Sequence, residues 1–289
     1  MYNGNQNLKS IGEVYEWGEH EISEYVKCQK DPIYFIENYC HIVTLDHGLQ
    51  RFKLYEKQKE LVHKIVENRK VISMQFRQSG KTTVSAAVFL WYALFNENYT
   101  IAIMANKGSA ARECLSRFQL MYENLPLWMQ QGIKTWNKGD IELENGSKIF
   151  TGATSASGIR GKTVNLLYID EAAIIPNHIA EQFFASVYPV ISSGTTTKIL
   201  VTSTPLGYNH FWALWTAAEN DKNGFVPFKI DYWEIPGRDE AWAEEQRKTL
   251  GDLKFNQEIL IKFLGSSNAL ISGSALQRLT DCIQEPIFH

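Results

Sequence analysis

The sequence has few cysteines, no long apolar run and little net charge. Its four cysteines, Cys28, Cys40, Cys114 and Cys282, lie far apart and form no CxxC pair. This distribution is typical of reduced thiols, not of a disulfide framework, and the spacings to nearby histidines fit no common zinc pattern. Nowhere do eighteen apolar residues run together, and the N-terminus lacks the apolar core of a signal peptide. We therefore expect a soluble protein that is not secreted.

The formal net charge of −3 argues against a protein that holds nucleic acid over its whole surface, because phosphate neutralisation needs clustered Lys and Arg. Any contact with DNA must be local. A length of 289 residues with 44% hydrophobic residues suffices for one substantial core. The chain shows no internal repeat and no low-complexity tract. Its first 54 residues mix polar and aromatic types, and they predict an N-terminal appendage with a short helix over Ile33–Tyr39 and a loop at Asp46–Gly48.

From Tyr55 onward, short apolar runs alternate with segments of helical periodicity. This alternation predicts an α/β fold with a mostly parallel central sheet covered by helices on both faces. One interruption, over residues 140–151, carries Asn145-Gly146 between alternating segments and predicts a hairpin. The predicted strands are Lys70–Met74, Thr100–Ala105, Asn165–Ile169, Lys198–Ser203 and Val226–Asp231. The predicted helices are Tyr55–Asn68, Thr82–Phe95, Ser109–Asn124, His178–Val187, Asn209–Asn220, Asp239–Leu250 and Leu253–Ile261.

This pattern divides the chain into residues 1–54, a core with a following helical subdomain at 55–264, and a linker at 265–289. The linker is inferred from Gly265-Ser-Ser-Asn268, after which about twenty residues remain. So short a segment cannot form another domain.

A loop between a predicted strand and a predicted helix carries the clearest chemical signal, QFRQSGKTT at residues 75–83. In such a loop, backbone N–H groups and the positive helix end face phosphate oxygens, a lysine reaches the terminal phosphates, and a hydroxyl binds Mg²⁺. A glutamine stands where the common pattern GxxxxGK[ST] has its first glycine, and GKT alone is a frequent accident. The candidate nucleotide-binding residues here are Gln75, Arg77, Gln78, Ser79, Gly80, Lys81, Thr82 and Thr83, with Thr82 also a metal ligand.

A second element lies at the end of the strand Leu166-Leu-Tyr-Ile-Asp170-Glu171. A buried strand would deliver Asp170 to the coordination shell of Mg²⁺, and Glu171 would polarise the attacking water. By itself such an ending is usually only a strand that meets a loop. Its place downstream of the GKT loop within an alternating pattern predicts hydrolysis of ATP or GTP.

Two further groups fit the same site. Tyr55 and Gln58 lie one helix upstream of the loop, where they would bind adenine by stacking and hydrogen bonding; the alternative is an ordinary amphipathic helix. Thr202, Ser203 and Thr204 end the next strand, where their hydroxyls would face the γ-phosphate and couple hydrolysis to movement. The alternative for this group is simple termination of the strand by a proline.

Charge that develops on a transferred phosphoryl group is commonly met by an arginine. Two candidates are present: Arg77 within the phosphate loop, and Arg160 in the glycine-flanked segment Ser157–Gly161. For each, the alternative is an ordinary surface arginine.

At these residues the sequence resembles the large terminase subunits of tailed bacteriophages, in particular the T4-like group. The matching stretches span Tyr55 to Gly273 and are FRQSGKTT, WNKGDIELENGS, YIDEAAIIP, PVISSG, TSTPLGYNHFWALWTAA and ALISG. The resemblance implies a P-loop ATPase of the additional-strand, catalytic-glutamate class. It assigns Gln58 to an adenine motif, Lys81 and Thr82 to Walker A, Asp170 and Glu171 to Walker B, and Ser203-Thr204 to the coupling motif. It suggests arginine-finger roles for Arg77 or Arg160.

The resemblance also implies a setting. Such a motor forms a ring of neighbouring copies on the portal protein of the procapsid, in the host-cell cytoplasm, with double-stranded DNA in its channel and a small terminase subunit that selects the DNA. Large terminases carry a C-terminal nuclease domain; nothing after Gly265 supplies one, so we expect a longer natural chain and no nuclease activity here. The rival interpretations are one lobe of a superfamily-two helicase, for which no second lobe is visible, and a nucleotide-dependent binding switch, which Glu171 disfavours.

Overall fold

A mixed sheet forms the centre of the protein, whose computed structural model describes residues 1–155, 159, 161–192 and 194–265. Within these residues, eight strands have the order β10-β3-β9-β8-β4-β7-β6-β5. Neighbouring strands from β10 to β7 run parallel, and β6 and β5 are antiparallel. The strands are β3 (Lys70–Gln75), β4 (Thr100–Ala105), β5 (Ile133–Trp136), β6 (Asp140–Leu143), β7 (Lys148–Ala153), β8 (Leu166–Asp170), β9 (Lys198–Ser203) and β10 (Val226–Ile230).

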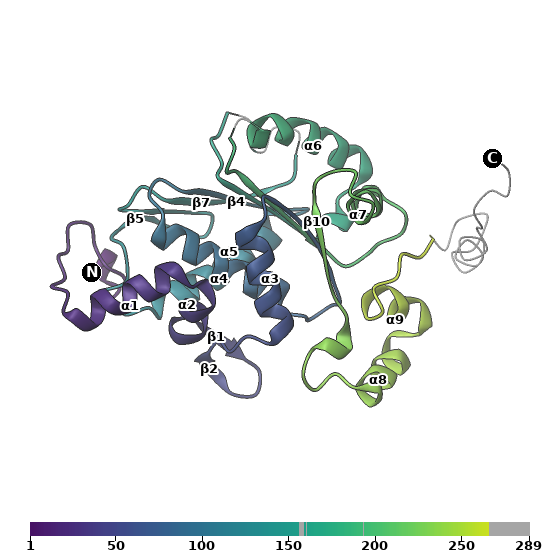
Figure 1. The fold of residues 1–289 in the computed structure, drawn as a ribbon, viewed down its shortest axis with the longest axis horizontal. Helices are drawn as coiled ribbons and strands as arrows, with labels where there is room; N and C mark the ends of the chain where they lie inside the picture. Colours follow the sequence, from purple (N-terminus) through teal and green to yellow (C-terminus); the bar gives the residue numbers. More distant parts are fainter. Residues whose placement is uncertain (156–158, 160, 193, 266–289) are drawn as a thin grey trace.

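Helices cover both faces of this sheet, as Figure 1 shows, with α3, α4 and α5 on one face and α6 and α7 on the other. This arrangement confirms the predicted α/β fold. Its bounds are α1 (Glu19–Lys30), α2 (Pro32–Tyr39), α3 (Glu56–Glu67), α4 (Lys81–Phe95), α5 (Gly108–Glu123), α6 (Asn177–Ser192), α7 (His210–Glu219), α8 (Glu240–Leu250) and α9 (Asp252–Glu258). No helix among the described residues is both long and apolar enough to cross a lipid bilayer.

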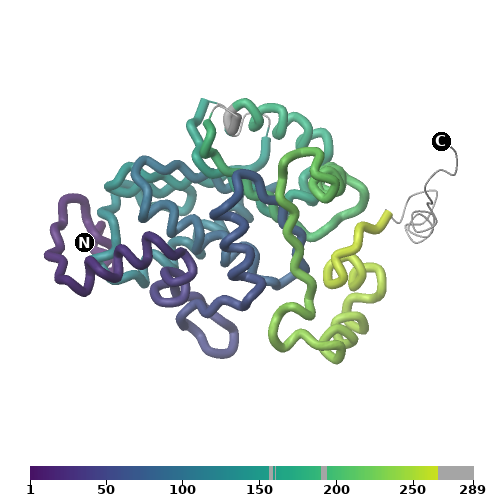
Figure 2. The backbone as a smooth tube through the Cα atoms, viewed as in Figure 1, coloured from purple at the N-terminus to yellow at the C-terminus, as the bar shows by residue number. Residues whose placement is uncertain are grey.

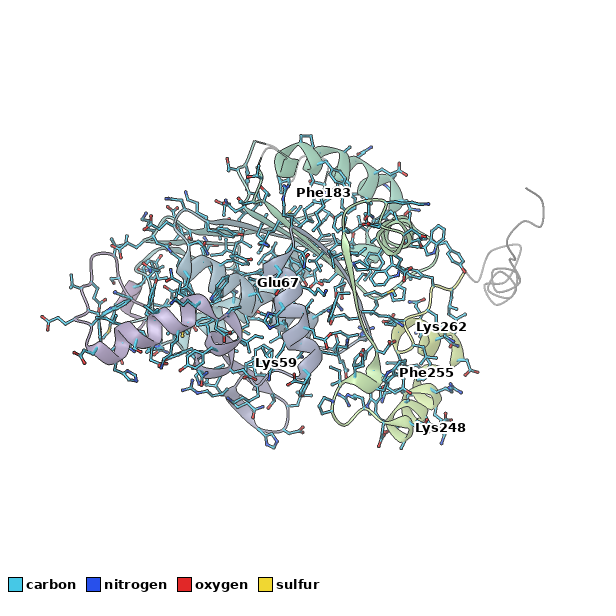
Figure 3. All side chains as sticks on the ribbon, viewed as in Figure 1. Lys59, Glu67, Phe183, Lys248, Phe255 and Lys262 are labelled. Atoms are coloured by element: carbon cyan, nitrogen blue, oxygen red, sulfur yellow. The ribbon has the colours of Figure 1, made fainter. Side chains whose placement is uncertain are left out.

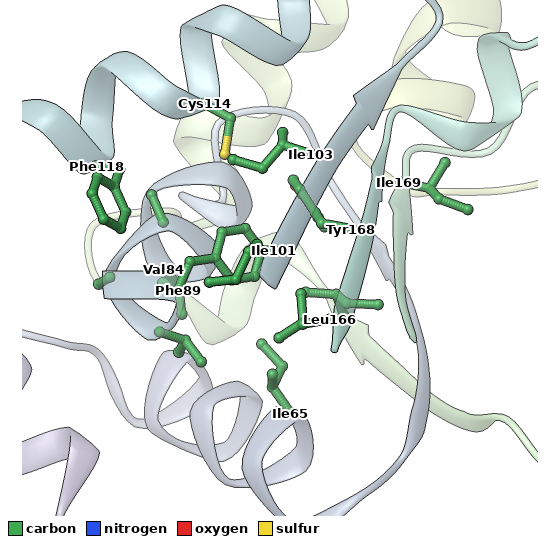
Figure 4. Packing of buried hydrophobic residues seen from close by; sticks show 14 of the residues in the cluster. Ile65, Val84, Phe89, Ile101, Ile103, Cys114, Phe118, Leu166, Tyr168 and Ile169 are labelled. Carbon is green, nitrogen blue, oxygen red and sulfur yellow. The ribbon is translucent and has the colours of Figure 1, made fainter. Parts of the chain in front are cut away.

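Helix α4 is the centre of the packing. Its residues are buried from Val84 almost without interruption to Phe95, because it lies between the sheet and other helices instead of facing water. Figure 4 shows this core: Phe89 of α4 packs near Tyr168 of β8, with a distance of 5.1 Å between ring centres. Apolar side chains of α3, α5 and β4 complete the layer. The N-terminal end of α4, where the candidate phosphate loop lies, is thus fixed by a dry core.

The first 54 residues contain more structure than the sequence predicted. Helix α2 matches the expected helix, whereas α1 and the hairpin of β1 (His41–Thr44) and β2 (Gly48–Arg51) were not predicted. The segment packs on α4: Trp91 donates its indole N–H to the Cys28 carbonyl at 2.8 Å, and Phe35 contacts Phe95 edge to face. Its buried side chains belong to the same apolar cluster as the sheet.

The antiparallel edge confirms the predicted hairpin. Asp140 pairs with Phe150 across β6 and β7, and Gly146 in the connecting turn has a φ of +83°, which favours glycine. Strand β5, which the sequence analysis missed, adds a further antiparallel strand outside β6.

After β10 the chain forms a short 3₁₀ helix, η3 (Tyr232–Glu234), and then the pair α8 and α9. Phe255, labelled in Figure 3, is the buried residue of α9, and the Arg247 guanidinium of α8 lies 4.7 Å from its ring centre. This pair lies at the opposite end of the molecule from the N-terminus (Figure 2). Apart from Gly265, the predicted linker at 265–289 falls outside the described residues.

Candidate functional site

The candidate phosphate loop joins the end of β3 to the start of α4. Gln78 and Gly80 have φ angles of +70° and +85°, so the loop reverses direction through two left-handed residues. A Cβ on Gly80 would lie 2.7 Å from Nε2 of Gln58, closer than real contacts allow. Both the backbone conformation and the space therefore require glycine at this position, directly before the helix N-terminus at Lys81.

Buried side chains support the loop from below. The Gln75 amide donates to Ser73 Oγ at 2.7 Å and accepts from Ser79 Oγ at 2.8 Å, and all three residues are buried. The sequence analysis expected Gln75 and Ser79 to bind nucleotide. Their side chains instead bind each other, because an amide offers both a donor and an acceptor. Any contact of these two residues with a nucleotide is left to their backbone groups.

Gln58 also supports the loop. Its Nε2 donates to the Ser79 carbonyl at 3.0 Å, and its Oε1 accepts from the Tyr55 backbone N–H at 3.1 Å, which caps α3. The Gln58 side chain is buried, whereas Tyr55 is 41% exposed. The expected adenine contacts of Tyr55 and Gln58 stay predictions, and the structure gives Gln58 a further role as a clamp on the loop.

A cavity of about 350 Å³ opens beside the loop. It joins the phosphate loop and the start of α3 to the β1–β2 hairpin and to the segment before α8. Its lining residues are Ile42, Thr44, Gln50, Arg51, Phe52, Lys53, Tyr55, Gln58, Gln78, Ser79, Gly80, Thr83, Ile235, Pro236 and Arg238.

Asp170 lies at the carboxyl end of β8 and is 95% buried, with a relative exposure of 5%. Its Oδ2 accepts from Thr82 Oγ1 at 3.1 Å, and its Oδ1 accepts from Thr202 Oγ1 at 3.0 Å. Because β3, β9 and β8 are parallel neighbours, their carboxyl ends meet at one edge of the sheet. The structure thus brings together Thr82 and Asp170, the two side chains predicted as metal ligands.

Glu171 follows directly and is exposed, with a φ of +50°. Left-handed backbone is costly for a residue with a Cβ and persists only where its surroundings hold it. Here the Glu171 N–H donates to Asp170 Oδ1 at 3.0 Å, and the 3₁₀ helix η2 (Ala172–Ile174) begins at once. The strained turn directs the Glu171 carboxylate away from the strand while Asp170 stays within the buried network.

The candidate coupling residues contact this same segment. Thr202 donates to Asp170 and bonds with the Tyr168 hydroxyl at 3.0 Å, and Ser203 Oγ accepts from the Ala173 N–H at 3.0 Å. Both hydroxyls were expected to face a γ-phosphate. The structure turns them toward the Asp170–Ala173 segment, because β9 pairs directly with β8. Thr204 lies half-buried at the same end of β9.

The two candidate arginines stand differently. Arg77 has an exposed side chain, and its backbone N–H donates to the Glu258 carbonyl at the end of α9 at 3.0 Å. Arg160 lies outside the described residues. Their predicted roles therefore remain predictions.

One residue near the site was missed by the sequence analysis. Arg117, on α5, donates Nη1 to Thr83 Oγ1 at 2.9 Å. It belongs to no motif, and only the packing of α5 against α4 brings it to the loop.

The described residues hold no group of three or more His, Cys, Asp or Glu side chains arranged for a metal ion. Cys28, Cys40 and Cys114 are buried free thiols, and burial raises the pKa of Cys28 to about 12. Cys282 falls outside the part of the chain that the structure describes.

Comparison with known proteins gives consistent matches. The family described as "Terminase large subunit, T4likevirus-type, N-terminal" matches residues 72–278. The large terminase subunits of Thermus virus P23-45 and Thermus phage G20c are each 25% identical over 135 residues, which cover 42% of this chain and 27% of theirs. The chain thus spans about a quarter of the length of these curated relatives.

Solved structures share the fold. The large terminase of bacteriophage HK97 has a TM-score of 0.66 at 15% identity and covers 81% of this chain and 55% of its own. The large terminase ATPase domain of Thermus phage P74-26 has a TM-score of 0.59 at 18% identity and covers 73% and 94%. A large terminase from a thermophilic bacteriophage, in complex with ADP, has a TM-score of 0.59 at 14% identity and covers 73% and 54%.

Proposed function

The chain belongs to the family of T4-type terminase large subunits, and from this premise we propose that it is an ATP-hydrolysing motor that drives double-stranded DNA into a procapsid. The observation that carries the ATPase assignment is the meeting of the loop and strand motifs: Thr82 of the loop helix donates to Asp170 at 3.1 Å. These residues lie far apart in sequence, and only a nucleotide site of this class needs them together.

Thr82 and Asp170 fit a magnesium ion. Mg²⁺ prefers oxygen ligands and is usually held by one or two carboxylates together with substrate phosphates and water, so a cluster of three acidic residues is not needed. Asp170 is buried, and among the described residues it has hydrogen bonds but no cationic partner. When bound, the ion neutralises charge on the phosphates.

The remaining residues take roles around the same point. Loop amides and Lys81, at the N-terminus of α4, bind the phosphates of ATP. Glu171, exposed at the tip of β8, orients and polarises the attacking water. The Asp170–Ala173 segment, bonded to Thr202 and Ser203, carries a change at the phosphates into β9. The ADP complex of the structural neighbour supports a nucleotide as the ligand.

A simple experiment tests this assignment. The wild-type chain should release phosphate from ATP in the presence of Mg²⁺, and EDTA should abolish the release. Lys81→Ala should weaken ATP binding about tenfold or more, because hydrogen bonds to charged groups contribute ~1.5–3 kcal/mol. Wild-type protein that binds no adenine nucleotide in calorimetry would contradict the proposal.

The partners follow from the family and are part of the same proposal. We place the motor at the procapsid portal in the cytoplasm of an infected cell, as a ring of copies that binds the portal protein, a small terminase subunit and double-stranded DNA. With a net charge of −3, the protein should bind DNA locally and weakly, and the binding should fall steeply with salt.

A further inference from the structure

Arg117 is held against the first turn of α4 by directed hydrogen bonds. Its Nη1 donates to Thr83 Oγ1 at 2.9 Å, and its Nη2 donates to Glu113 Oε1, one turn earlier on α5, at 3.3 Å. The side chain is 41% exposed, yet its Nε is buried and has no hydrogen-bond partner in the described structure. A buried N–H of a guanidinium is costly to leave unpaired, so its position calls for an explanation.

Thr83 separates Arg117 from the candidate nucleotide site. It lines the cavity beside the phosphate loop together with Ser79, Gly80 and Tyr55. It also lines a second cavity, of about 240 Å³, whose wall includes Arg117 and Glu113. Arg117 therefore acts on the first cavity through the side chain of Thr83.

The bond between the two residues leaves the Thr83 hydroxyl with one function. A threonine hydroxyl has one hydrogen to donate and lone pairs that accept, and Arg117 can only donate. The Arg117 bond therefore uses an acceptor position and leaves the hydroxyl hydrogen for another acceptor. A cationic donor also polarises the O–H group, which strengthens the bond that the hydroxyl donates in turn.

The position of Thr83 indicates which phosphate it meets. Thr82 turns its hydroxyl to Asp170, toward the metal and the terminal phosphates. Thr83 faces instead the cavity that runs to Tyr55, the side where the base is expected. The phosphate between these two sides is the one joined to the nucleoside.

We propose that Arg117 is a positioning residue for nucleotide binding, which orients and polarises the Thr83 hydroxyl as a donor to the α-phosphate. The inference rests on the proposed function and deepens it by adding a residue outside the known motifs. ATP and ADP share the α-phosphate, so the contribution of Arg117 should be equal for both and should concern affinity, not the chemical step.

The test measures binding and turnover in matched variants. Arg117→Gln should weaken binding of fluorescently labelled ADP and ATP by about tenfold, the size expected for a charge-assisted bond, and raise KM with kcat unchanged. Arg117→Lys should recover part of the affinity, since it keeps a cationic donor. Glu113→Gln is the control, because it removes the other bond of the same guanidinium and leaves the Thr83 contact; it should bind like wild type.

Variants at Thr83 keep the proposal testable if Arg117→Gln folds poorly. Thr83→Val removes the hydroxyl without a change of charge and should match the affinity loss of Arg117→Gln, whereas Thr83→Ser should bind like wild type. The double variant Arg117→Gln/Thr83→Val should be no weaker than either single variant, because both remove one shared chain of hydrogen bonds.

Three results would overturn the inference: unchanged affinity in Arg117→Gln, a fall in kcat at constant KM, or additive losses in the double variant. Each of these presupposes a wild-type chain that binds nucleotide. A wild-type chain that binds neither ADP nor ATP contradicts the proposed function instead, so the two failures are distinguishable.

Discussion

Glu171 combines an exposed carboxylate with a left-handed backbone, fixed by the bond from its N–H to Asp170. Replacement by glutamine keeps the size and the backbone bond and removes the base. Glu171→Gln should bind ATP as tightly as wild type and lose turnover by about 10²–10⁴-fold, the usual contribution of a general base. Stopped-flow binding together with a phosphate-release assay measures both. Turnover near the wild-type rate would remove Glu171 from the mechanism.

Gly80 is a second position where a single atom matters. Alanine there would combine a φ of +85° with a Cβ 2.7 Å from the Gln58 amide. Gly80→Ala should lower the free energy of unfolding by about 1–3 kcal/mol and weaken nucleotide binding, because the loop must shift away from Gln58. Gly12→Ala is the control: its φ is +70°, but nothing lies within 4 Å of the added Cβ. An equal loss of stability in both variants would show that the Gln58 contact has no effect.

At the residue scale, motif chemistry predicted some side chains well and others not. The contact of Thr82 with Asp170 follows from motifs whose geometry is fixed by the sheet. The amide bonds of Gln58 and Gln75 do not, since a sequence shows that an amide is near a loop but not which groups it satisfies. Arg117 carried no signal at all, because its contact depends on how two helices pack.

Among the elements, α1 and α2 are joined by a charged centre. Glu24 of α1 accepts hydrogen bonds from Lys27, Tyr39 and Tyr34 at 2.7–2.8 Å. These bonds, that of Lys27 first, lower the pKa of Glu24 from 4.5 to about 2. A depressed pKa means that this stabilisation is complete above pH 4.5 and is lost as the pH falls toward 2.

Glu24→Gln should therefore reduce the free energy of unfolding at pH 7 by about 1–3 kcal/mol, the range for bonds to a charged acceptor. The difference from wild type should shrink as the pH falls from 4.5 toward 2. Thermal unfolding followed by circular dichroism over this range measures it. Glu19→Gln, at the exposed start of the same helix, is the control for the change in charge. A difference that stays constant with pH would contradict the role of the Glu24 charge.

The elements that were predicted differ physically from those that were missed. Strands β4 and β9 were predicted with their observed bounds, because each is an apolar run buried on both faces. Helix α1 was missed, since only Glu24 and Cys28 of its residues are buried and its apolar periodicity is weak. Strands β1 and β2 are short and largely exposed, so they lack the alternation that marks a strand.

At the scale of the whole molecule, the phosphate loop touches the C-terminal pair of helices. The Arg77 N–H bonds to the carbonyl of Glu258, and Phe76 meets Trp242 of α8 edge to face, with 6.2 Å between ring centres. A movement of the loop on nucleotide binding would therefore be felt by α8 and α9. This pair precedes the last described residues, which gives a direct physical connection between the loop and the C-terminal part of the chain.

The source of the catalytic arginine also belongs to this scale. Arg77, within the phosphate loop, is tethered to its own nucleotide, whereas Arg160 lies between glycines in the connection from β7 to β8. We assign Arg160, as a hypothesis, to the ATP of a neighbouring subunit. An isolated monomer then lacks a complete site, and ATPase activity per molecule should rise with protein concentration.

Mixing two inactive proteins separates the possibilities more sharply. Arg160→Ala lacks the arginine, and Glu171→Ala lacks the base. In a mixed ring, some interfaces join an intact Glu171 of one subunit to an intact Arg160 of the next, so part of the ATPase activity should return. An arginine that acts within its own chain gives no rescue, because every subunit then keeps its own defect. If mass measurements show mixed rings and no activity returns, Arg160 does not act between subunits.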